Sequence, residues 1–170
     1  MNQSKYLKDM LDRFQMSDCK PKSIPCDPSV NKLTLEDSDL MEDCRLYREM
    51  VGCLIYVMTG TRPDLCYVVT VLAQHLAKPS KAHLSFVKHV FRYIKGTIDH
   101  SLKFTKSDFP LQLIGYCDAD WGASPDRRSI TGYCFQLNNC GPLISWKSRR
   151  QRVVALSSCE AEYMAMSSCT

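Results

Sequence analysis

The sequence lacks any long uninterrupted run of apolar residues. Hydrophobic residues make up 45% of its 170 residues, yet no stretch approaches the roughly 18 consecutive apolar residues that a membrane-spanning helix needs. The first fourteen residues are amphipathic and have no apolar centre of the kind that a secretory signal peptide contains. We therefore expect an intracellular chain, cytoplasmic or nuclear, without a membrane partner.

Closely spaced cysteine pairs are also missing. None of the ten cysteines belongs to a Cys-x-x-Cys pair, and the spacing therefore disfavours both a structural zinc site and a disulfide framework. Internal repeats and low-complexity segments are absent too. The net charge is only +4, but residues 51–110 carry eight basic and three acidic groups, which places the basic excess in the middle of the chain.

The pattern of the chain predicts four segments. Residues 1–16 have the apolar spacing of an amphipathic helix. Residues 17–43 lose all periodicity and hold three prolines and an acidic cluster, which indicates an exposed linker. Residues 44–108 predict three more helices. Residues 109–170 change to alternating patterns, which indicates a second unit built on strands.

The helices of the third segment have clear punctuation. Gly60 closes the first, Pro63 stands in the first turn of the second, and Ser80 can cap the third. The first of them should bury the face that carries Leu46, Met50, Leu54 and Val57. The four histidines show no spacing typical of a ligand set, so we expect them at the surface or at the edge of the core; they are His75, His83, His89 and His100.

The last segment predicts three strands followed by a helix. The strands are expected at Leu111–Asp118, Ile130–Leu137 and Leu143–Ser148, with turns between them. The helix should begin near Ser157, because Ser157 and Glu160 have the spacing of a capping box. The fold class is therefore α/β, or α+β overall, with a mainly helical part before the strands.

Two acidic residues in this segment are candidates for chemistry. Asp118 ends a strand otherwise built for burial, where a carboxylate either caps the turn or holds a cation. Glu160 is explained by the capping box, whereas Glu162 shares a helix face with Ala165, Met166 and Cys169, a face expected to pack on the sheet. A functional role is the better interpretation of such an acid. A helix packed on the sheet would let Asp118 and Glu162 share hard cations.

Four ordered motifs make the chain resemble the ribonuclease H region of copia-type retrotransposon polyproteins. They are YCDADWG at residues 116–122, DRRSITGY at 126–133, ISWKS at 144–148 and VALSSCEAEY at 154–163. Upstream, YREMVG at 47–52, LIY at 54–56, TRPD at 61–64 and RYIKGT at 92–97 are similar to the connection between reverse transcriptase and ribonuclease H. The resemblance covers essentially the whole chain.

The resemblance implies an incomplete ribonuclease H-like fold and a metal-dependent activity. The family hydrolyses the RNA strand of an RNA–DNA hybrid with two Mg²⁺ ions held by four carboxylates. Asp118 matches the family's first aspartate and Glu162 its helix glutamate. The other two carboxylates lie further along in the family than Thr170, and the Tyr-x-Asp-Asp pattern of reverse transcriptases is absent. We therefore expect no polymerase chemistry and no hydrolysis by this chain alone.

The densest basic cluster is a candidate nucleic-acid contact. It consists of Lys147, Arg149, Arg150 and Arg152, and the family interpretation is that these side chains approach phosphates. A solvated hairpin end is an equally good interpretation, because strand alternation places Trp146 on the opposite face from Lys147. A second basic surface, on the helix that carries Lys88, Arg92 and Lys95, is more typical of a solvated face.

Two functional hypotheses from different classes remain. The first is a fragment of a retrotransposon reverse transcriptase and ribonuclease H polyprotein, whose partners are the hybrid and the rest of the polyprotein. The second is a non-catalytic nucleic-acid-binding or interaction protein retained from such an element, and a pseudogene product is a third possibility. A secreted effector is not expected, because the sequence has neither an Arg-x-Leu-Arg motif nor a signal peptide.

Overall fold

The computed structural model describes residues 1–27, 40–106, 110–138 and 141–169. Its contacts divide the chain into two compact units: residues 2–101 form a helical unit, and Met1 with residues 102–170 forms a sheet unit. The predicted change of pattern after Asp108 falls on a residue outside the described ranges. The predicted fold class is confirmed, because helices come first and three strands and a helix follow.

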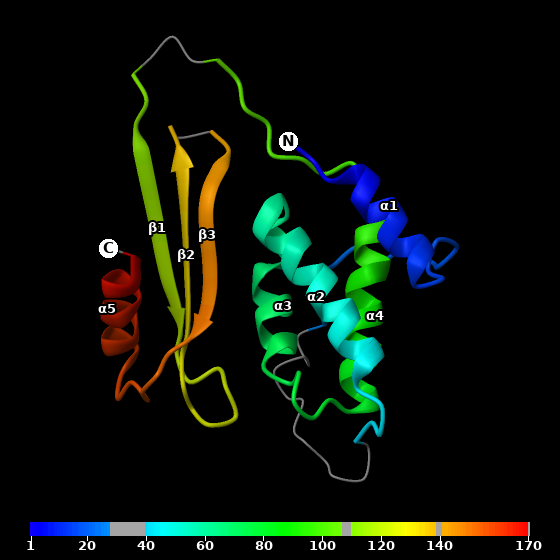
Figure 1. Cartoon of the computed structure of the whole chain (residues 1–170). Coiled ribbons are helices and arrows are strands. Elements are labelled where there is room, and N and C mark those ends of the chain that lie inside the picture. The colour runs from blue at the N-terminus through cyan, green and yellow to red at the C-terminus, as the bar shows by residue number, and fades with distance from the viewer. Residues whose placement is uncertain (28–39, 107–109, 139–140, 170) are drawn as a thin grey trace. The chain divides into compact units, whose positions relative to one another are not determined.

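The sheet unit is an antiparallel sheet of three strands with one helix. The strands β1 (Leu113–Asp120), β2 (Ile130–Leu137) and β3 (Leu143–Arg150) lie in the order β1-β2-β3. The helix α5 (Ser158–Cys169) packs against β1 and β2 (Figure 1). The sequence placed β1 two residues too early and ended β3 two residues too early. Asp120 still pairs with Ile130, and Arg150 pairs with the same residue from the other side. Asp118 therefore lies inside β1 and not at its end.

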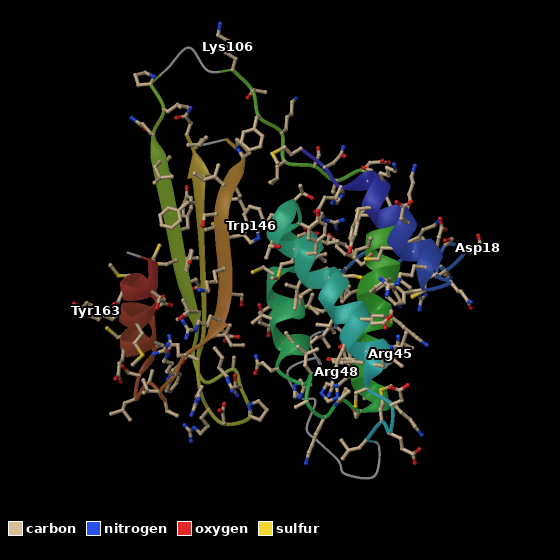
Figure 2. All side chains as sticks on the ribbon, in the orientation of Figure 1. Asp18, Arg45, Arg48, Lys106, Trp146 and Tyr163 are labelled. Atoms are coloured by element: carbon tan, nitrogen blue, oxygen red, sulfur yellow. The ribbon has the colours of Figure 1, made fainter. Side chains whose placement is uncertain are left out.

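The two faces of this sheet have different surroundings. Cross-strand partners share a face, and the register pairs Ala119 with Thr131 and Thr131 with Arg149. The Thr131 hydroxyl accepts a hydrogen bond from the Gln151 side chain, which also donates a hydrogen bond to the Ala161 carbonyl of α5. The helix therefore covers the face that carries Thr131. Trp146 leaves β3 on the other face (Figure 2), as strand alternation predicted.

The helical unit contains α1 (Ser4–Arg13), α2 (Arg45–Gly60), the short 3₁₀ helix η3 (Pro63–Leu65), α3 (Cys66–Ala73) and α4 (Lys81–Gly96) (Figure 1). Its core is apolar and draws on the predicted faces of α1, α2 and α4. One position of α2 was predicted wrongly: Leu46 is 42% exposed, and its neighbour Tyr47 is fully buried. Tyr47 tolerates burial because its hydroxyl donates a hydrogen bond to the Leu72 carbonyl.

A buried arginine joins three parts of the helical unit. The Arg62 side chain is 1% exposed and forms an ion pair with Asp64 at 2.8 Å. Its guanidinium also donates to the carbonyl and to the hydroxyl of Thr97, which follows α4. The Tyr93 hydroxyl donates to Asp64 in turn. Asp64 keeps a third of its side-chain surface exposed, so the pair is half-buried, and its contacts with Thr97 and Tyr93 hold η3 against the end of α4.

The described ends of the predicted linker form hydrogen bonds with α4 and with the residues that precede α4. The backbone N–H of Lys22 donates to the Arg92 carbonyl, and the Arg92 side chain donates to the carbonyl of Lys20. On the other side of the gap, the Met41 N–H donates to the Pro79 carbonyl. Most of the predicted acidic cluster lies in residues 28–39, outside the described ranges. None of the described helices combines the length and the apolar character that crossing a membrane requires.

One histidine was predicted wrongly as a surface or core-edge residue. His83 is fully buried at the start of α4 and forms a reciprocal capping box with Ser80. Its ring lies 4.0 Å from the ring of His75, between centroids, and no described group is bonded to its Nε2 atom. Burial, with a smaller contribution from His75, lowers the pKa of His83 to about 4.

We expect His83 to make the stability of the chain depend on pH. The unfolded chain takes up a proton on this histidine near pH 6.5, whereas the folded chain does so only near pH 4. The free energy of unfolding should therefore fall as the pH is lowered from 7 to 5, by about 1–2 kcal/mol. His83→Gln keeps a side-chain acceptor for the capping box and should flatten this slope.

Urea unfolding followed by circular dichroism at pH 7, 6 and 5 measures the slope. His100→Gln is the matched control, because His100 is exposed, and it should keep the pH dependence of the wild type. A His83→Gln variant with an unchanged slope would show that protonation of His83 is not linked to folding.

Candidate functional site

Buried polar groups hold the turn after β1 against the segment between β3 and α5. Ser129 is fully buried, and its hydroxyl accepts a hydrogen bond from the Gly122 N–H at 3.2 Å. The Ser129 carbonyl accepts from the backbone N–H of Gln151 at 2.8 Å. Gly122 has a φ of +64°, a conformation that glycine adopts without the steric cost of a Cβ. The Trp121 indole donates to the carbonyl of Ala155, so this corner of the unit is fixed.

Gln151 connects the sheet to α5. Its side chain is nearly buried, with the residue 8% exposed. Its Nε2 donates to the Thr131 hydroxyl at 3.0 Å and to the Ala161 carbonyl at 2.9 Å. The second bond fixes the orientation of the amide, because a carbonyl can only accept. The Oε1 atom is buried and has no partner among the described residues.

The basic cluster is divided by its ion pairs. Arg150 pairs with Asp126 at 3.1 Å, and Arg128 pairs with the same carboxylate. Lys147, Arg149 and Arg152 are exposed, and none of them forms an ion pair within the described parts of the chain. Three of the four cations of the predicted cluster therefore form no ion pair with the described residues, whereas Arg150 shares one carboxylate with Arg128.

These three cations border a groove between β2, β3 and α5. The groove has a volume of about 400 Å³. Its walls carry residues of both strands, of the segment after β3 and of the outer face of α5, and they include Thr131, Tyr133, Lys147, Arg149, Gln151, Arg152, Tyr163 and Met164. Tyr133 pairs directly with Lys147 across the strands, so a tyrosine ring and a cation share one face. We call this site the β3–α5 groove.

The predicted catalytic aspartate lies elsewhere on the sheet. Asp118 and Asp120 are exposed in β1 and share the face of Tyr116 by strand alternation. Cys117 lies on the opposite face of β1, where it lines a second hollow together with Met166 of α5. Alternation therefore directs Asp118 to the face of the sheet that α5 does not cover.

The two glutamates of α5 have the different roles that the sequence predicted for their backbone contacts. Glu160 is half-buried, and its carboxylate accepts from the Leu156 N–H at 2.7 Å. Its own N–H donates to the Ser157 hydroxyl, so Glu160 serves the start of the helix. Glu162 is half-buried, with no such capping bond. The buried stripe of α5 is Ala161 and Ala165; Met166, which was expected in it, is 57% exposed.

The carboxylates of the described residues are not gathered into a metal-binding group. Among the described residues, no group of three or more His, Cys, Asp and Glu side chains is arranged to hold a metal ion. Asp118 and Glu162 come from elements that pack together, yet strand alternation points Asp118 away from α5. The assignment of these two residues to metal binding and catalysis stays a prediction.

The second basic surface is partly engaged within the helical unit. Lys88 is exposed on α4, whereas the Arg92 guanidinium donates to the Lys20 carbonyl at 2.7 Å. This bond supports the interpretation of a solvated face with a structural arginine.

Sequence reasoning found the cations of the β3–α5 groove but missed its floor and its rings. Thr131 and Tyr133 alternate along β2 on one face, which was a usable signal for a shared wall with Lys147 and Arg149. Tyr163 directly follows Glu162, and its side chain is 74% exposed. Gln151 gave no signal, because a single glutamine after a strand is typical of exposed surface.

Comparison with known proteins identifies the relatives of the chain. It is 40% identical to the retrovirus-related Pol polyprotein from transposon TNT 1-94 of Nicotiana tabacum over 97% of its length, and 39% identical to that from transposon RE1 of Arabidopsis thaliana over 98%. The chain spans only 13% and 11% of the length of these polyproteins.

Shorter relatives match as well. The chain is 39% identical to an uncharacterised mitochondrial protein of Arabidopsis thaliana, over 98% of its own length and 67% of that protein's. It is 46% identical, over 73% of its length, to a protein of Plasmopara viticola named as a secreted RxLR effector. No protein-family model and no solved structure matches the chain. With about 40% identity over nearly all of its length, the chain belongs to the family of copia-type retrotransposon Pol polyproteins and corresponds to a segment of them.

Proposed function

We propose that this segment contributes a nucleic-acid contact to a retrotransposon polyprotein that hydrolyses the RNA strand of RNA–DNA hybrids. The observation that carries the proposal is the gathering of three cations at the β3–α5 groove that form no ion pair with any described residue, namely Lys147, Arg149 and Arg152. A cation that neutralises a phosphate releases condensed counterions, so such contacts add affinity that depends on salt. Phosphates carry no sequence information, and the binding should be alike for every sequence.

The choice of Lys147 and Arg149 follows from their surroundings. Both leave β3 on the face of α5, and their β2 partners across the strands are Tyr133 and Thr131. Arg150 is held by Asp126, so its charge is partly neutralised within the chain. Long cationic side chains that form no ion pair with the described part of the chain can follow a phosphate backbone.

We expect the double substitution of Lys147→Ala and Arg149→Ala to weaken binding to an RNA–DNA hybrid at low salt. The slope of log K against log salt should become shallower by about 0.9 for each lost phosphate contact. Fluorescence anisotropy of a labelled hybrid measures the affinity and the slope between 50 and 300 mM salt. Over this range the Debye length falls from about 14 to about 6 Å, so the electrostatic part of the binding should weaken.

The matched control removes two exposed cations from another surface. Lys81→Ala with Lys88→Ala changes the net charge by the same amount on α4, where both side chains are exposed. Equal slopes for the two double variants would show that net charge alone governs binding. Equal slopes for the wild type and the Lys147/Arg149 variant would remove the groove from the proposal.

The catalytic part of the proposal rests on the family's chemistry. The resemblance supplies Asp118 and Glu162, two of four carboxylates, and a two-metal hydrolysis draws on the complete set. Magnesium is the ion that these oxygen ligands would take, and its chemistry would be to activate the attacking water. The intracellular location expected from the sequence also stays part of this proposal.

We expect purified chain to leave RNA–DNA hybrids intact in the presence of magnesium. In a longer polyprotein segment that is active, Asp118→Asn or Glu162→Gln should reduce cleavage to background, whereas Glu160→Gln should keep most of it, because Glu160 serves the backbone. Cleavage of a labelled hybrid, resolved by gel electrophoresis, is the measurement. Loss of activity in Glu160→Gln but not in Glu162→Gln would reverse the two assignments.

A non-catalytic binding protein is the second candidate function. Two observations favour this candidate. Asp118 is exposed on the face of the sheet that α5 does not cover. The described residues contain no group of three metal-binding side chains. The two candidates share the basic groove and differ only in hydrolysis, so the cleavage assay separates them.

A further inference from the structure

The second hollow beside α5 is lined by three side chains that contain sulfur. It has a volume of about 540 Å³. Cys117 comes from β1, whereas Met166 and Cys169 come from α5. The two cysteines are far apart in the sequence, and the packing of α5 against β1 places them at one hollow. We call this site the β1–α5 hollow.

The two cysteines face each other across the β1–α5 hollow. Alternation along β1 places Cys117 on the same face as Ala119, which is the face that α5 covers. On α5, Cys169 follows the buried residues Ala161 and Ala165 at every fourth position, so it continues the stripe that packs on the sheet. Both cysteines are free thiols and half-buried. A small ligand can therefore reach them from solvent.

The electrostatics of the sheet agree with this position of Cys169. Burial, with a smaller contribution from Cys169, raises the pKa of the Cys134 thiol in β2. Two groups influence each other in this way only when they lie close together. The Cys169 side chain therefore lies near the strands and does not extend into open solvent.

This set of donors matches a soft metal ion. Thiolates and thioethers are the ligands that select copper(I), whereas zinc and iron–sulfur clusters draw on four strong donors. None of the described lining residues carries a carboxylate, so the hollow does not suit a hard ion such as magnesium. Only two of the donors are cysteines, and the group is therefore distinct from the clusters of three His, Cys, Asp and Glu side chains that the described residues lack.

A bridging ion also suits two thiols that belong to different layers of the unit. A disulfide needs its two sulfur atoms about 2.0 Å apart. A metal–thiolate bond is about 2.3 Å long, so one ion joins two sulfur atoms up to about 4.6 Å apart. The ion therefore spans a wider separation between sheet and helix than a disulfide does.

We propose that the β1–α5 hollow binds one copper(I) ion between the thiolates of Cys117 and Cys169, with the Met166 thioether as a third and weaker ligand. Each thiol releases its proton to solvent on binding. The ion keeps its oxidation state, so the step consumes no oxidant and no reductant. The bound ion joins the C-terminal end of α5 to β1 and stabilises the folded chain by mass action.

The first test measures each thiol in the intact chain. The reduced chain, with or without one equivalent of copper(I) and without oxygen, is alkylated briefly with N-ethylmaleimide. Peptide mass spectrometry then gives the labelled fraction of every cysteine. Copper(I) should slow the labelling of Cys117 and Cys169 severalfold and leave Cys159, which is exposed on α5, unchanged. Unprotected Cys117 and Cys169, or equal protection of Cys159, would overturn the inference.

The second test removes one ligand at a time. Competition with the copper(I) chelator bicinchoninic acid measures the affinity of Cys117→Ser, Cys169→Ser and, as the matched control, Cys159→Ser. Loss of a ligand should cost at least as much as loss of a residue that orients one, about 10–100-fold in affinity, and the control should bind like the wild type. Circular dichroism without copper checks that all three variants fold. Equal affinities of the three folded variants would overturn the site.

The third test concerns the thioether. Met166→Leu keeps an apolar side chain of similar size and removes the sulfur atom, at a position that is 57% exposed. Met164→Leu is the matched control, because Met164 lines the β3–α5 groove. Copper(I) binding should weaken severalfold in Met166→Leu and stay unchanged in Met164→Leu. Equal affinities of the two variants would overturn the assignment of Met166 as the third ligand.

Discussion

The sheet unit depends on one buried amide. Gln151 follows β3, and its backbone N–H reaches the strand-flanking residue Ser129, while its side chain bonds Thr131 of β2 and Ala161 of α5. Each of these bonds contributes about 1 kcal/mol, but their arrangement matters more than their sum. They fix the angle at which the chain leaves the sheet and returns as α5, and so they create the groove beside β3.

The face that α5 covers and the face that it leaves uncovered differ in chemistry. Lys147 and Arg149 leave β3 toward the helix side, whereas Asp118 and Tyr116 leave β1 toward the uncovered side. Two of the cations that border the groove therefore lie on the opposite face of the sheet from Asp118. The carboxylate of Asp126 is paired with Arg150 and Arg128.

In the helical unit, local sequence patterns predicted the helix ends but not which polar side chains are buried. Its helices begin and end close to the predicted residues, since Pro63, Ser80 and Gly60 act through local backbone geometry. The burial of Arg62 and of His83 was not predicted. Polar residues of this kind are expected at the surface, and only partners brought from distant positions, such as Thr97 for Arg62, make their burial affordable.

The order of elements, the family and the cations of the basic cluster could be predicted from the sequence, because periodicity, turn residues and motifs are local properties of the chain. Strand alternation even separated Trp146 from Lys147 correctly. Tertiary packing was needed to show that Arg150 shares the Asp126 carboxylate with Arg128 and that Gln151 lines a groove between the sheet and α5. These facts depend on contacts between residues ten or more positions apart or on the packing of a helix against a sheet, and no local pattern encodes which acceptor a buried side chain will meet.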